Sequence, residues 1–137
     1  MSDAAGLPAP VPAVSPETQA FWDATAQGRL LLPRCDDCGE VFWYPRGLCP
    51  RCGSLAVSWV EASGRGRIYS FAVNRRGEGD YAQAAPYVLA YVELDEGPRL
   101  MTNVVDADPA ELAVDAPVVV AFADTGQGSA LVRFRLA

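Results

Sequence analysis

The sequence contains no histidine and no lysine, and each absence excludes a class of chemistry. Without histidine the chain has no imidazole for a catalytic triad, for a metal site or for proton transfer near neutral pH. Without lysine it has neither a Schiff-base nucleophile nor a P-loop lysine. The side chains left for chemistry are four cysteines, five tyrosines, eleven arginines and seventeen carboxylates. We therefore predict no catalytic residue in this chain, which is not expected to run a reaction alone.

The sequence also lacks an excess of positive charge and a long apolar run. Its formal net charge of -6 disfavours nucleic acid and anionic membranes as partners, because both attract basic surfaces. No stretch approaches the roughly 18 apolar residues of a membrane helix. The N-terminus is rich in proline and has no basic segment, unlike a signal peptide. A cytoplasmic protein is expected, in which cysteines stay reduced unless they bind a metal.

A helix is predicted from Pro16 to Gln27. Ser15 is a suitable N-cap, proline is favoured in a first turn, and Gly28 is a typical helix end. Phe21 and Trp22 are adjacent and cannot share one narrow helical stripe, so at least one should face something outside this segment. Two alternatives are open, which are packing on the segment that follows or contact with a partner protein.

The hydrophobic pattern changes to a period of two after the cysteine region Pro33–Gly53, which predicts a mainly β fold. The expected strands are Ser58–Glu61, Arg67–Asn74, Tyr87–Leu94, Leu100–Asp106, Val118–Ala123 and Ala130–Leu136. A helical turn is expected at Pro109–Leu112, after Asp108 as its cap. About five long strands with a helical insert before the fourth fit a closed barrel of the OB-fold type better than a sandwich.

All four cysteines lie in one motif, C-x2-C-x10-C-x2-C, formed by Cys35, Cys38, Cys49 and Cys52. Two residues between thiolates allow one tight turn to direct both sulfurs at one metal ion, and two such turns complete a tetrahedron. Gly39 and Gly53 follow the two pairs and suit turns that need a positive φ. Four thiolates leave no open position, so the site is predicted to hold one structural Zn²⁺ per chain.

Three other interpretations of the cysteine motif are open. Two disulfides or four free thiols are disfavoured by a reducing compartment and by the turn glycines. A redox-active C-x-x-C pair is disfavoured because two nearby copies usually share a metal. The same four sulfurs also suit iron, which would make the chain an electron-transfer protein, and the colour of the purified protein distinguishes iron from zinc.

An apolar run that includes Phe42, Trp43 and Tyr44 separates the two cysteine pairs. A ribbon of about 20 residues has little core of its own, so part of this run should cover the metal site or the barrel. Any part left exposed marks an interface. With Phe21 and Trp22, these three aromatic residues are the predicted partner-binding residues, and packing between ribbon and barrel is the alternative.

Four arginines frame the first long strand of the barrel. Arg65 and Arg67 lie at its entry, and Arg75 and Arg76 follow its end. Guanidinium groups match phosphate geometry, so these four residues are candidates for binding the phosphates of a nucleotide-containing ligand. The alternative is ordinary solvated charge at strand ends, and for any single arginine it is the better interpretation.

Seven short motifs in succession resemble the thiolase-associated family called domain of unknown function 35 (DUF35), over about residues 17 to 136. The motifs are Phe21-Trp22-Asp23, Gly28-Arg29-Leu30, Pro33-Arg34-Cys35-x-x-Cys38-Gly39, Tyr44-Pro45-Arg46, Cys49-Pro50-x-Cys52-Gly53, Gly64-x-Gly66-x-Ile68-Tyr69-Ser70 and Pro86-Tyr87-Val88.

The resemblance implies an N-terminal helix, a rubredoxin-like zinc ribbon and a C-terminal OB-fold barrel. It also implies a complex with a thiolase-like subunit that acts on acyl-CoA esters, as a heterotetramer built on a thiolase dimer. In steroid side-chain degradation a member of this family pairs with a thiolase-like aldolase that cleaves a hydroxy-acyl-CoA by a retro-aldol reaction. The ribbon and helix would dock on the partner, and the barrel would help to bind the CoA ester.

From these features we expect four segments. They are a flexible tail over residues 1–14, a helix and lead-in over 15–31, the zinc ribbon over 32–57 and the OB-fold over 58–137. The leading hypothesis is a non-catalytic accessory subunit of an acyl-CoA aldolase or thiolase complex. The alternative is a nucleic-acid-binding module, because zinc ribbons and OB-folds also serve that role.

Overall fold

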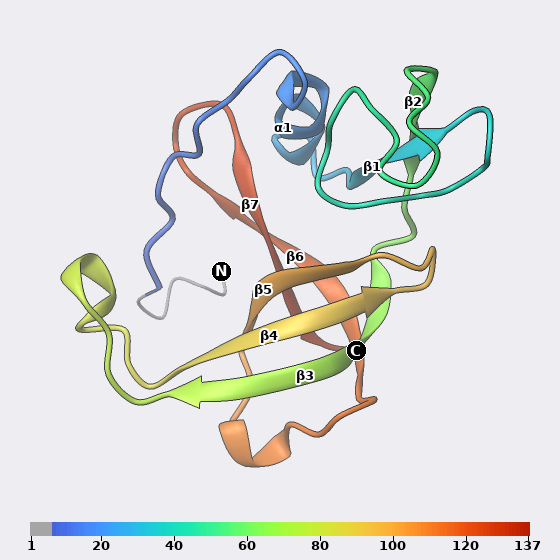
Figure 1. Ribbon diagram of the computed structural model, residues 1–137. Helices are drawn as coiled ribbons and strands as arrows, with labels where there is room; N and C mark the ends of the chain where they lie inside the picture. Colours follow the sequence, from blue (N-terminus) through green and yellow to red (C-terminus); the bar gives the residue numbers. More distant parts are fainter. Residues whose placement is uncertain (1–6) are drawn as a thin grey trace.

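The computed structural model describes residues 7–137, so the part of the expected flexible tail over residues 1–6 lies outside the described residues. The predicted fold class is confirmed: a short helix and a small two-stranded sheet pack on a closed five-stranded barrel (Figure 1). Within the described range, no helix is long and apolar enough to cross a membrane. The elements are α1 (Gln19–Thr25), β1 (Leu31–Cys35), β2 (Val57–Glu61), β3 (Arg65–Asn74), η2 (Gly79–Tyr81), β4 (Tyr87–Leu94), β5 (Arg99–Val105), η3 (Pro109–Glu111), β6 (Pro117–Asp124) and β7 (Ala130–Leu136).

The barrel has the strand order β3-β4-β5-β7-β6 and closes where β6 pairs with β3. All pairs are antiparallel except β5 with β7, which are parallel and paired only at Val104–Phe134 and Val105–Arg135. The 3-10 turn η3 lies between the third and fourth barrel strands, where the sequence predicted a helical insert. This is the topology of an OB-fold.

Alternation of burial explains why these segments are strands. On β4, Val88, Ala90, Val92 and Leu94 are buried, whereas Tyr91 between them is exposed. Successive side chains of a strand point to opposite faces, so one face fills the barrel and the other meets solvent. The outward positions of the barrel are therefore the ones available for contacts.

Strand β2 pairs with β1, not with a barrel strand, over the register from Leu31–Glu61 to Cys35–Val57. The sequence predicts the OB-fold from residue 58 onward, so most of this strand falls in that segment although its pairing partner lies in the ribbon. Leu30 and Leu32 at the start of this sheet belong to the same buried cluster as the barrel core. The ribbon is therefore fixed to the barrel through one continuous apolar interior.

Helix α1 is shorter than the helix predicted from Pro16 to Gln27. Before the helix, the backbone N–H of Ser15 donates to Thr18 Oγ1 and the N–H of Thr18 donates to the Ser15 carbonyl, each at 3.0 Å. These bonds close a separate turn, so the predicted cap residue does not cap the helix. After Thr25, the N–H of Gln27 bonds three residues back to Ala24 O at 2.9 Å, which tightens the chain out of α-helical geometry.

The tail from residue 7 to residue 14 has no regular secondary structure, as expected, yet it lies against the barrel. The buried side chain of Arg133 on β7 donates a hydrogen bond from Nη2 to the carbonyl of Pro8. Leu7 lines a pocket at one end of the barrel. This part of the tail is thus attached to the barrel by specific contacts.

Candidate functional site

The four cysteines lie on two turns of nearly the same design. In the first, the N–H of Cys35 donates to Glu40 O at 2.8 Å and the N–H of Gly39 donates to Cys35 O at 2.9 Å. In the second, the N–H of Cys49 donates to Ser54 O and the N–H of Gly53 donates to Cys49 O, each at 2.9 Å. The same two bonds, with the same spacing, shape both turns.

A glycine follows each cysteine pair, with φ of 80° at Gly39 and 79° at Gly53. Other residues rarely adopt this left-handed backbone, so glycine is the favoured residue at both positions. The conformation reverses the chain directly after Cys38 and after Cys52. The positive φ predicted from the sequence is therefore present in both turns.

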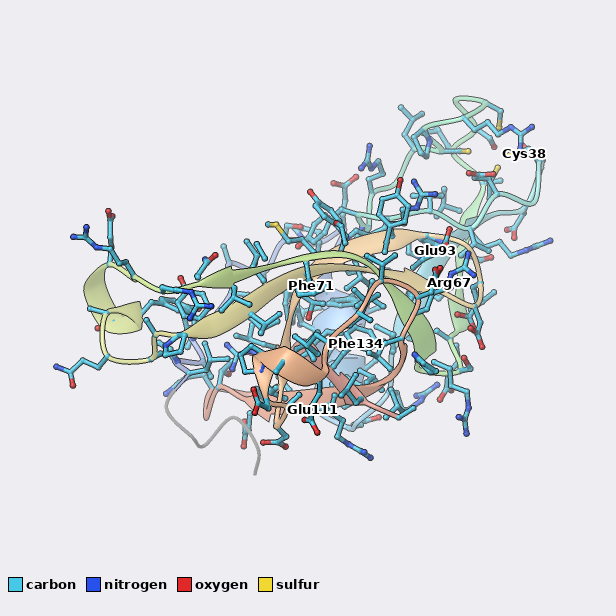
Figure 2. The ribbon with its side chains drawn as sticks, turned by 90° about the horizontal axis from the view of Figure 1, so that it is seen from below. Cys38, Arg67, Phe71, Glu93, Glu111 and Phe134 are labelled. Atoms are coloured by element: carbon cyan, nitrogen blue, oxygen red, sulfur yellow. The ribbon has the colours of Figure 1, made fainter. Side chains whose placement is uncertain are left out.

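The turns bring the four sulfur atoms within 4.8 Å of one another. Cys35 Sγ lies 3.6 Å from Cys52 Sγ, and Cys38 Sγ lies 3.7 Å from Cys49 Sγ. Four sulfurs at about 2.3 Å from a central Zn²⁺ stand roughly 3.8 Å apart in a tetrahedron. The donor set and its spacing therefore fit a four-thiolate metal site, and Cys35, Cys38, Cys49 and Cys52 are the residues that would hold the ion. Figure 2 labels Cys38 of this group.

The surroundings of the sulfurs favour thiolates only in part. Hydrogen bonds from the backbone N–H of Cys38 and of Asp37 outweigh burial and lower the pKa of Cys35 to about 7. At Cys52 a backbone bond from Ser54 favours the thiolate, but the Cys35 sulfur and burial raise the pKa to about 12. Adjacent thiolates repel one another, so full ionisation of the set requires a cation between them.

The four cysteines supply all the ligands of a tetrahedral metal ion. Cys35 and Cys49 are buried and form a small cluster with Phe42, whereas Cys38 and Cys52 are exposed at the tip of the ribbon. A metal with four thiolate ligands has no position for water or substrate, so its chemical role is to hold the ribbon together.

The structure assigns most of the predicted partner-binding aromatic residues to the interior. Phe21, Trp22 and Phe42 are only 1%, 8% and 5% exposed. The Phe21 ring packs edge-on against Trp22 at 4.8 Å and against Trp43 at 5.1 Å. The helix therefore packs on the ribbon that follows it, which is the first of the two alternatives for its aromatic residues. Trp43 is half-buried and Tyr44 is 41% exposed, so these two residues alone of the five still offer surface to a partner.

The four candidate arginines do not converge on one site. Arg65 and Arg67 lie at the start of β3, and Arg75 and Arg76 lie beyond its other end. Ten residues of strand separate Arg65 from Arg75, which is about 33 Å. Arg67 is also bound to Glu93 on β4, with Nη2 at 2.7 Å and Nε at 3.0 Å from one carboxylate oxygen. A single phosphate therefore cannot contact all four residues.

The sequence predicts Tyr44 as a partner-binding residue but does not show that exposed apolar residues of the barrel accompany it. We define the outer strip as Tyr44, Tyr69, Tyr91 and Met101, which are 41%, 46%, 47% and 58% exposed. Tyr44 and Met101 line one shallow pocket between ribbon and barrel, and Tyr91 is paired with Met101 across β4 and β5. The sequence carried a signal for these barrel residues. In a strand whose side chains alternate between the core and the solvent, a large apolar residue at an outward position has no barrel core to fill.

Two protein-family models match adjoining parts of the chain. The model described as the rubredoxin-like zinc ribbon domain of ChsH2 matches residues 22–58. The model described as the C-terminal OB-fold domain of ChsH2 matches residues 59–123. The two matches cover the metal turns and most of the barrel.

Two curated relatives are longer than this chain. The probable enoyl-CoA hydratase alpha subunit of Thermomonospora curvata is 37% identical over 92% of this chain and 39% of its own length. The benzoylsuccinyl-CoA thiolase subunit BbsA of Thauera aromatica is 32% identical over 59% of this chain and 57% of its own length. The chain thus spans less than two thirds of either relative.

A solved structure matches almost from end to end. A chain of the Ltp2-ChsH2(DUF35) aldolase is 36% identical, with a TM-score of 0.81, over 92% of this chain and 98% of that chain. The fold of this chain thus recurs over almost the whole of that chain. This chain belongs to the DUF35 family, in which a rubredoxin-like zinc ribbon precedes an OB-fold barrel.

Proposed function

We propose that this chain is a non-catalytic accessory subunit of a thiolase-like enzyme complex that acts on acyl-CoA esters. The proposal is carried by the likeness of this chain to the DUF35 chain of an aldolase. The two are 36% identical, and the match covers 98% of the aldolase chain. The hydratase and thiolase relatives also act on CoA esters by name. The chemistry of the chain agrees, because it has neither histidine nor lysine and its cysteines form a closed metal site.

The finer form of the proposal is a retro-aldolase of steroid side-chain degradation, in which this chain and the thiolase-like subunit form a heterotetramer. The partner supplies the acid and base groups for carbon–carbon cleavage. This chain docks on the partner and helps to bind the CoA ester, and its Zn²⁺ keeps the ribbon folded.

The outer strip is the docking surface in this proposal. Tyr44 and Met101 supply exposed apolar area at the junction of ribbon and barrel, next to the half-buried Trp43. Tyrosine and methionine are typical of interface cores, where they bury a large apolar area at a modest entropic cost.

Co-expression of this chain with a candidate thiolase-like protein tests the proposal. A stable complex, with acyl-CoA cleavage that requires both chains, is expected. Replacing both Tyr44 and Met101 with alanine should weaken capture of the partner at least tenfold, since buried interface anchors each cost more than about 1 kcal/mol when truncated. Leu55→Ala is the matched control, because Leu55 is 79% exposed but outside the strip. Full activity of the partner alone would refute the proposal.

The substrate panel separates the finer form from the coarser one. A hydroxy-acyl-CoA that carries a steroid ring system and one with a linear acyl group are offered to the complex, and the cleavage products are identified by mass spectrometry. Preference for the steroid ester supports the steroid assignment. Preference for the linear ester leaves the accessory role in place and removes the steroid role.

The nucleic-acid alternative has one feature in its favour, the exposed rings of Tyr69 and Tyr91 on an OB-fold barrel. The charges near these rings argue against nucleic-acid binding. Arg67 and Arg99 both bind Glu93, and the chain has a net charge of -6. A gel-shift assay at low salt is expected to give no band with single-stranded DNA or RNA.

A further inference from the structure

Strand β3 has a neighbour on both sides only at its start. Its pairing with β6 ends at Arg67–Pro117, whereas its pairing with β4 continues to Asn74–Tyr87. Figure 1 shows β3 and β4 continuing side by side toward the loop that contains η2, while β6 diverges from β3. Residues 70–74 of β3 therefore form a free sheet edge on the side away from β4.

A β-bulge sets the direction of the backbone groups along this edge. Before the bulge, the N–H of Ile68 donates to Ala116 O at 3.0 Å, so the Ile68 backbone faces β6. The register shift between Ile68 and Ser70 makes Tyr69 the extra residue of the bulge. The bulge reverses the alternation of backbone groups, so Ser70 faces β4 although Ile68 faces β6.

Beyond the bulge, successive residues face β4 and the free edge in turn. Ser70, Ala72 and Asn74 face β4, so the N–H and C=O groups of Phe71 and Val73 face the free edge. Neither of the last two residues makes a backbone hydrogen bond on this side with any residue between 7 and 137. Natural edge strands are protected by charged residues or proline, and this part of β3 contains neither. The edge can therefore accept another strand.

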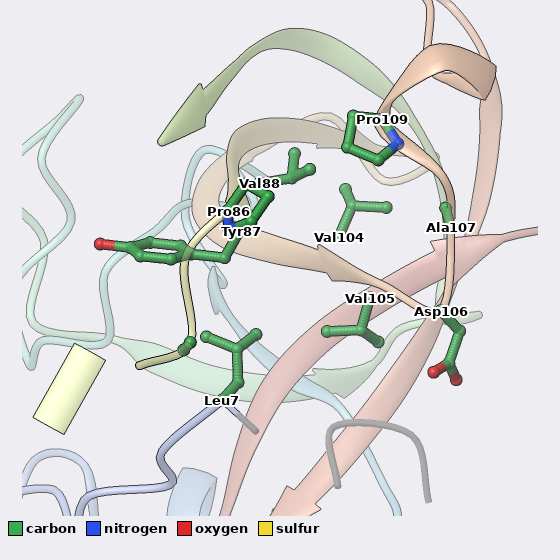
Figure 3. Close-up of a pocket in the computed structure, with 10 residues that line it drawn as sticks. Leu7, Pro86, Tyr87, Val88, Val104, Val105, Asp106, Ala107 and Pro109 are labelled. Carbon is green, nitrogen blue, oxygen red and sulfur yellow. The ribbon is translucent and has the colours of Figure 1, made fainter. Parts of the chain in front are cut away.

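The side chains at this edge are apolar and incompletely covered. Phe71 and Val73 face the barrel interior and pack against its core cluster, yet both are only half-buried. Val73 is paired with Val88, and Val88 with Val104. Figure 3 shows Val88 and Val104 on the wall of one pocket, so this layer of side chains is apolar across three strands. A strand added beside β3 would direct every second side chain into the same layer.

Two arginines directly follow the free edge. Arg75 and Arg76 are exposed, and neither makes an ion pair with any residue of the described chain. Guanidinium groups with free donors favour carboxylates of a binding partner. A segment that fits this edge therefore has an extended backbone, apolar residues at alternate positions and acidic residues near Arg75 and Arg76.

We propose that an extended acidic segment of the thiolase-like partner subunit adds to the free edge of β3 as a further strand. This proposal rests on the proposed function, which supplies the partner. The outer strip reaches β3 at Tyr69, so the free edge is continuous with the docking surface of that function. The backbone of Phe71 and Val73 binds the segment, and Arg75 and Arg76 bind its carboxylates in place of a CoA phosphate.

Hydrogen exchange with single-residue resolution, in the complex with the thiolase-like protein, tests the added strand. In the isolated chain, the amides of Phe71 and Val73 should exchange faster than the amide of Ala72, which faces β4. In the complex, exchange at Phe71 and Val73 is expected to slow at least tenfold, and exchange at Ala72 should change less. Unchanged exchange at Phe71 and Val73 in an active complex would overturn the proposal and leave the accessory role in place.

Two variants of one position test the hydrogen bond at the edge. Val73→Pro removes the N–H that faces the edge, and Val73→Ala shortens the same side chain but keeps the N–H. The proline variant should bind the partner about fivefold more weakly than the alanine variant, which is a typical effect of one lost hydrogen bond. Thermal denaturation of each isolated variant checks that it folds. Equal capture of the partner by two folded variants would contradict the added strand.

Charge reversal tests the two arginines. The double variant Arg75→Glu/Arg76→Glu should weaken capture of the partner about tenfold, because it replaces two attractive pairs with repulsion. Arg135→Glu is the matched control and should bind like the parent chain. Arg135 is exposed on β7 and makes no ion pair with any residue between 7 and 137. Unchanged capture by the double variant would show that the bound segment is not acidic.

Two other outcomes would also refute the proposal. If the isolated chain sediments as a dimer and the amides of Phe71 and Val73 are protected in it, the edge binds a second copy of this chain. If no complex with the thiolase-like protein forms, the accessory role is wrong, and so is the assignment of the edge to that partner.

Discussion

Closure of the barrel at Gly66 depends on the absence of a Cβ atom. Gly66 pairs with Leu94 on one side and with Val118 on the other, where β3 has neighbours on both edges. A Cβ at this position would lie 2.5 Å from the Glu93 carbonyl oxygen and 2.9 Å from Val92 Cγ1. Gly64 is similarly restricted, because it has φ of 81° and a Cβ there would lie 2.7 Å from a Val120 methyl group. The Gly-x-Gly motif is thus explained by strand packing.

The substitution Gly66→Ala is expected to lower the free energy of unfolding by about 2 kcal/mol, the typical cost of overpacking against backbone that cannot move. Urea denaturation followed by circular dichroism measures the change. Gly47→Ala is the control, because the nearest atom to its Cβ is the flexible Glu17 carboxylate, at 3.2 Å. A Gly66→Ala variant as stable as the parent chain would contradict the close approach of β3 to β4.

At the scale of elements, three barrel strands are linked on their outer face by a row of charges. Glu93 on β4 lies directly opposite Arg67 on β3 and Arg99 on β5. Its carboxylate accepts from Arg67 at 2.7 Å and lies 3.4 Å from Arg99 Nε, and the Arg99 guanidinium covers the Tyr69 ring at 3.9 Å. Cross-strand pairs of opposite charge fix the register of neighbouring strands. Figure 2 shows Arg67 and Glu93 side by side at this end of the sheet.

This row of charges makes part of the stability dependent on pH. Hydrogen bonds from Arg67, which outweigh burial, and the charges of Arg67 and Arg99 lower the pKa of Glu93. A carboxylate whose pKa is lowered by folding stabilises the folded state above its unfolded pKa, near 4.3, and loses that contribution as the pH falls through the folded pKa. Glu93→Gln is therefore expected to be less stable than the parent chain at pH 7, with a difference that shrinks below about pH 4.

Thermal denaturation between pH 3 and pH 7 measures the difference between parent and Glu93→Gln. Glu78→Gln is the matched control, because Glu78 is exposed and makes no ion pair with any residue of the described chain. It should follow the parent at every pH. If the difference in stability between the parent chain and Glu93→Gln were independent of pH, the variant would act through the shape of the side chain and not through its charge.

The elements that the sequence predicted well are those whose signal is local. β4 and β7 have the predicted bounds, and on β4 the burial alternates residue by residue. The metal turns follow from the spacing of cysteine and glycine. The helix was overestimated because the Ser15–Thr18 contact replaces a cap, and no propensity encodes that choice. Four of the five candidate aromatic residues form one chain of ring contacts, but which of their rings stay exposed depends on packing between distant segments. The candidate arginines lie at opposite ends of one strand and do not converge.

At the scale of the whole molecule, the chain has two interiors of very different size. The ribbon tip has only Cys35, Phe42 and Cys49 in its own cluster, with Val57 packed beside them. The barrel cluster includes the helix aromatics and extends to Leu30 and Leu32 at the base of the ribbon. So small a cluster cannot offset the entropy of ordering a ribbon, so the metal supplies the missing free energy at the tip and the barrel supplies it at the base.

Removal of the metal is therefore expected to unfold the tip of the ribbon and leave the barrel folded. The purified protein should be colourless, and metal analysis should find about one zinc ion per chain before treatment with a chelator and none afterwards. Hydrogen exchange should then lose protection in β1 and β2, at Leu31–Cys35 and Val57–Glu61, and keep it in β4 and β5. Because the base of the ribbon shares the barrel core, the loss should begin at the Cys35–Val57 end of the sheet. Restored zinc should reverse it, whereas barrel strands that lose protection at the same chelator concentration would show that the two interiors unfold as one.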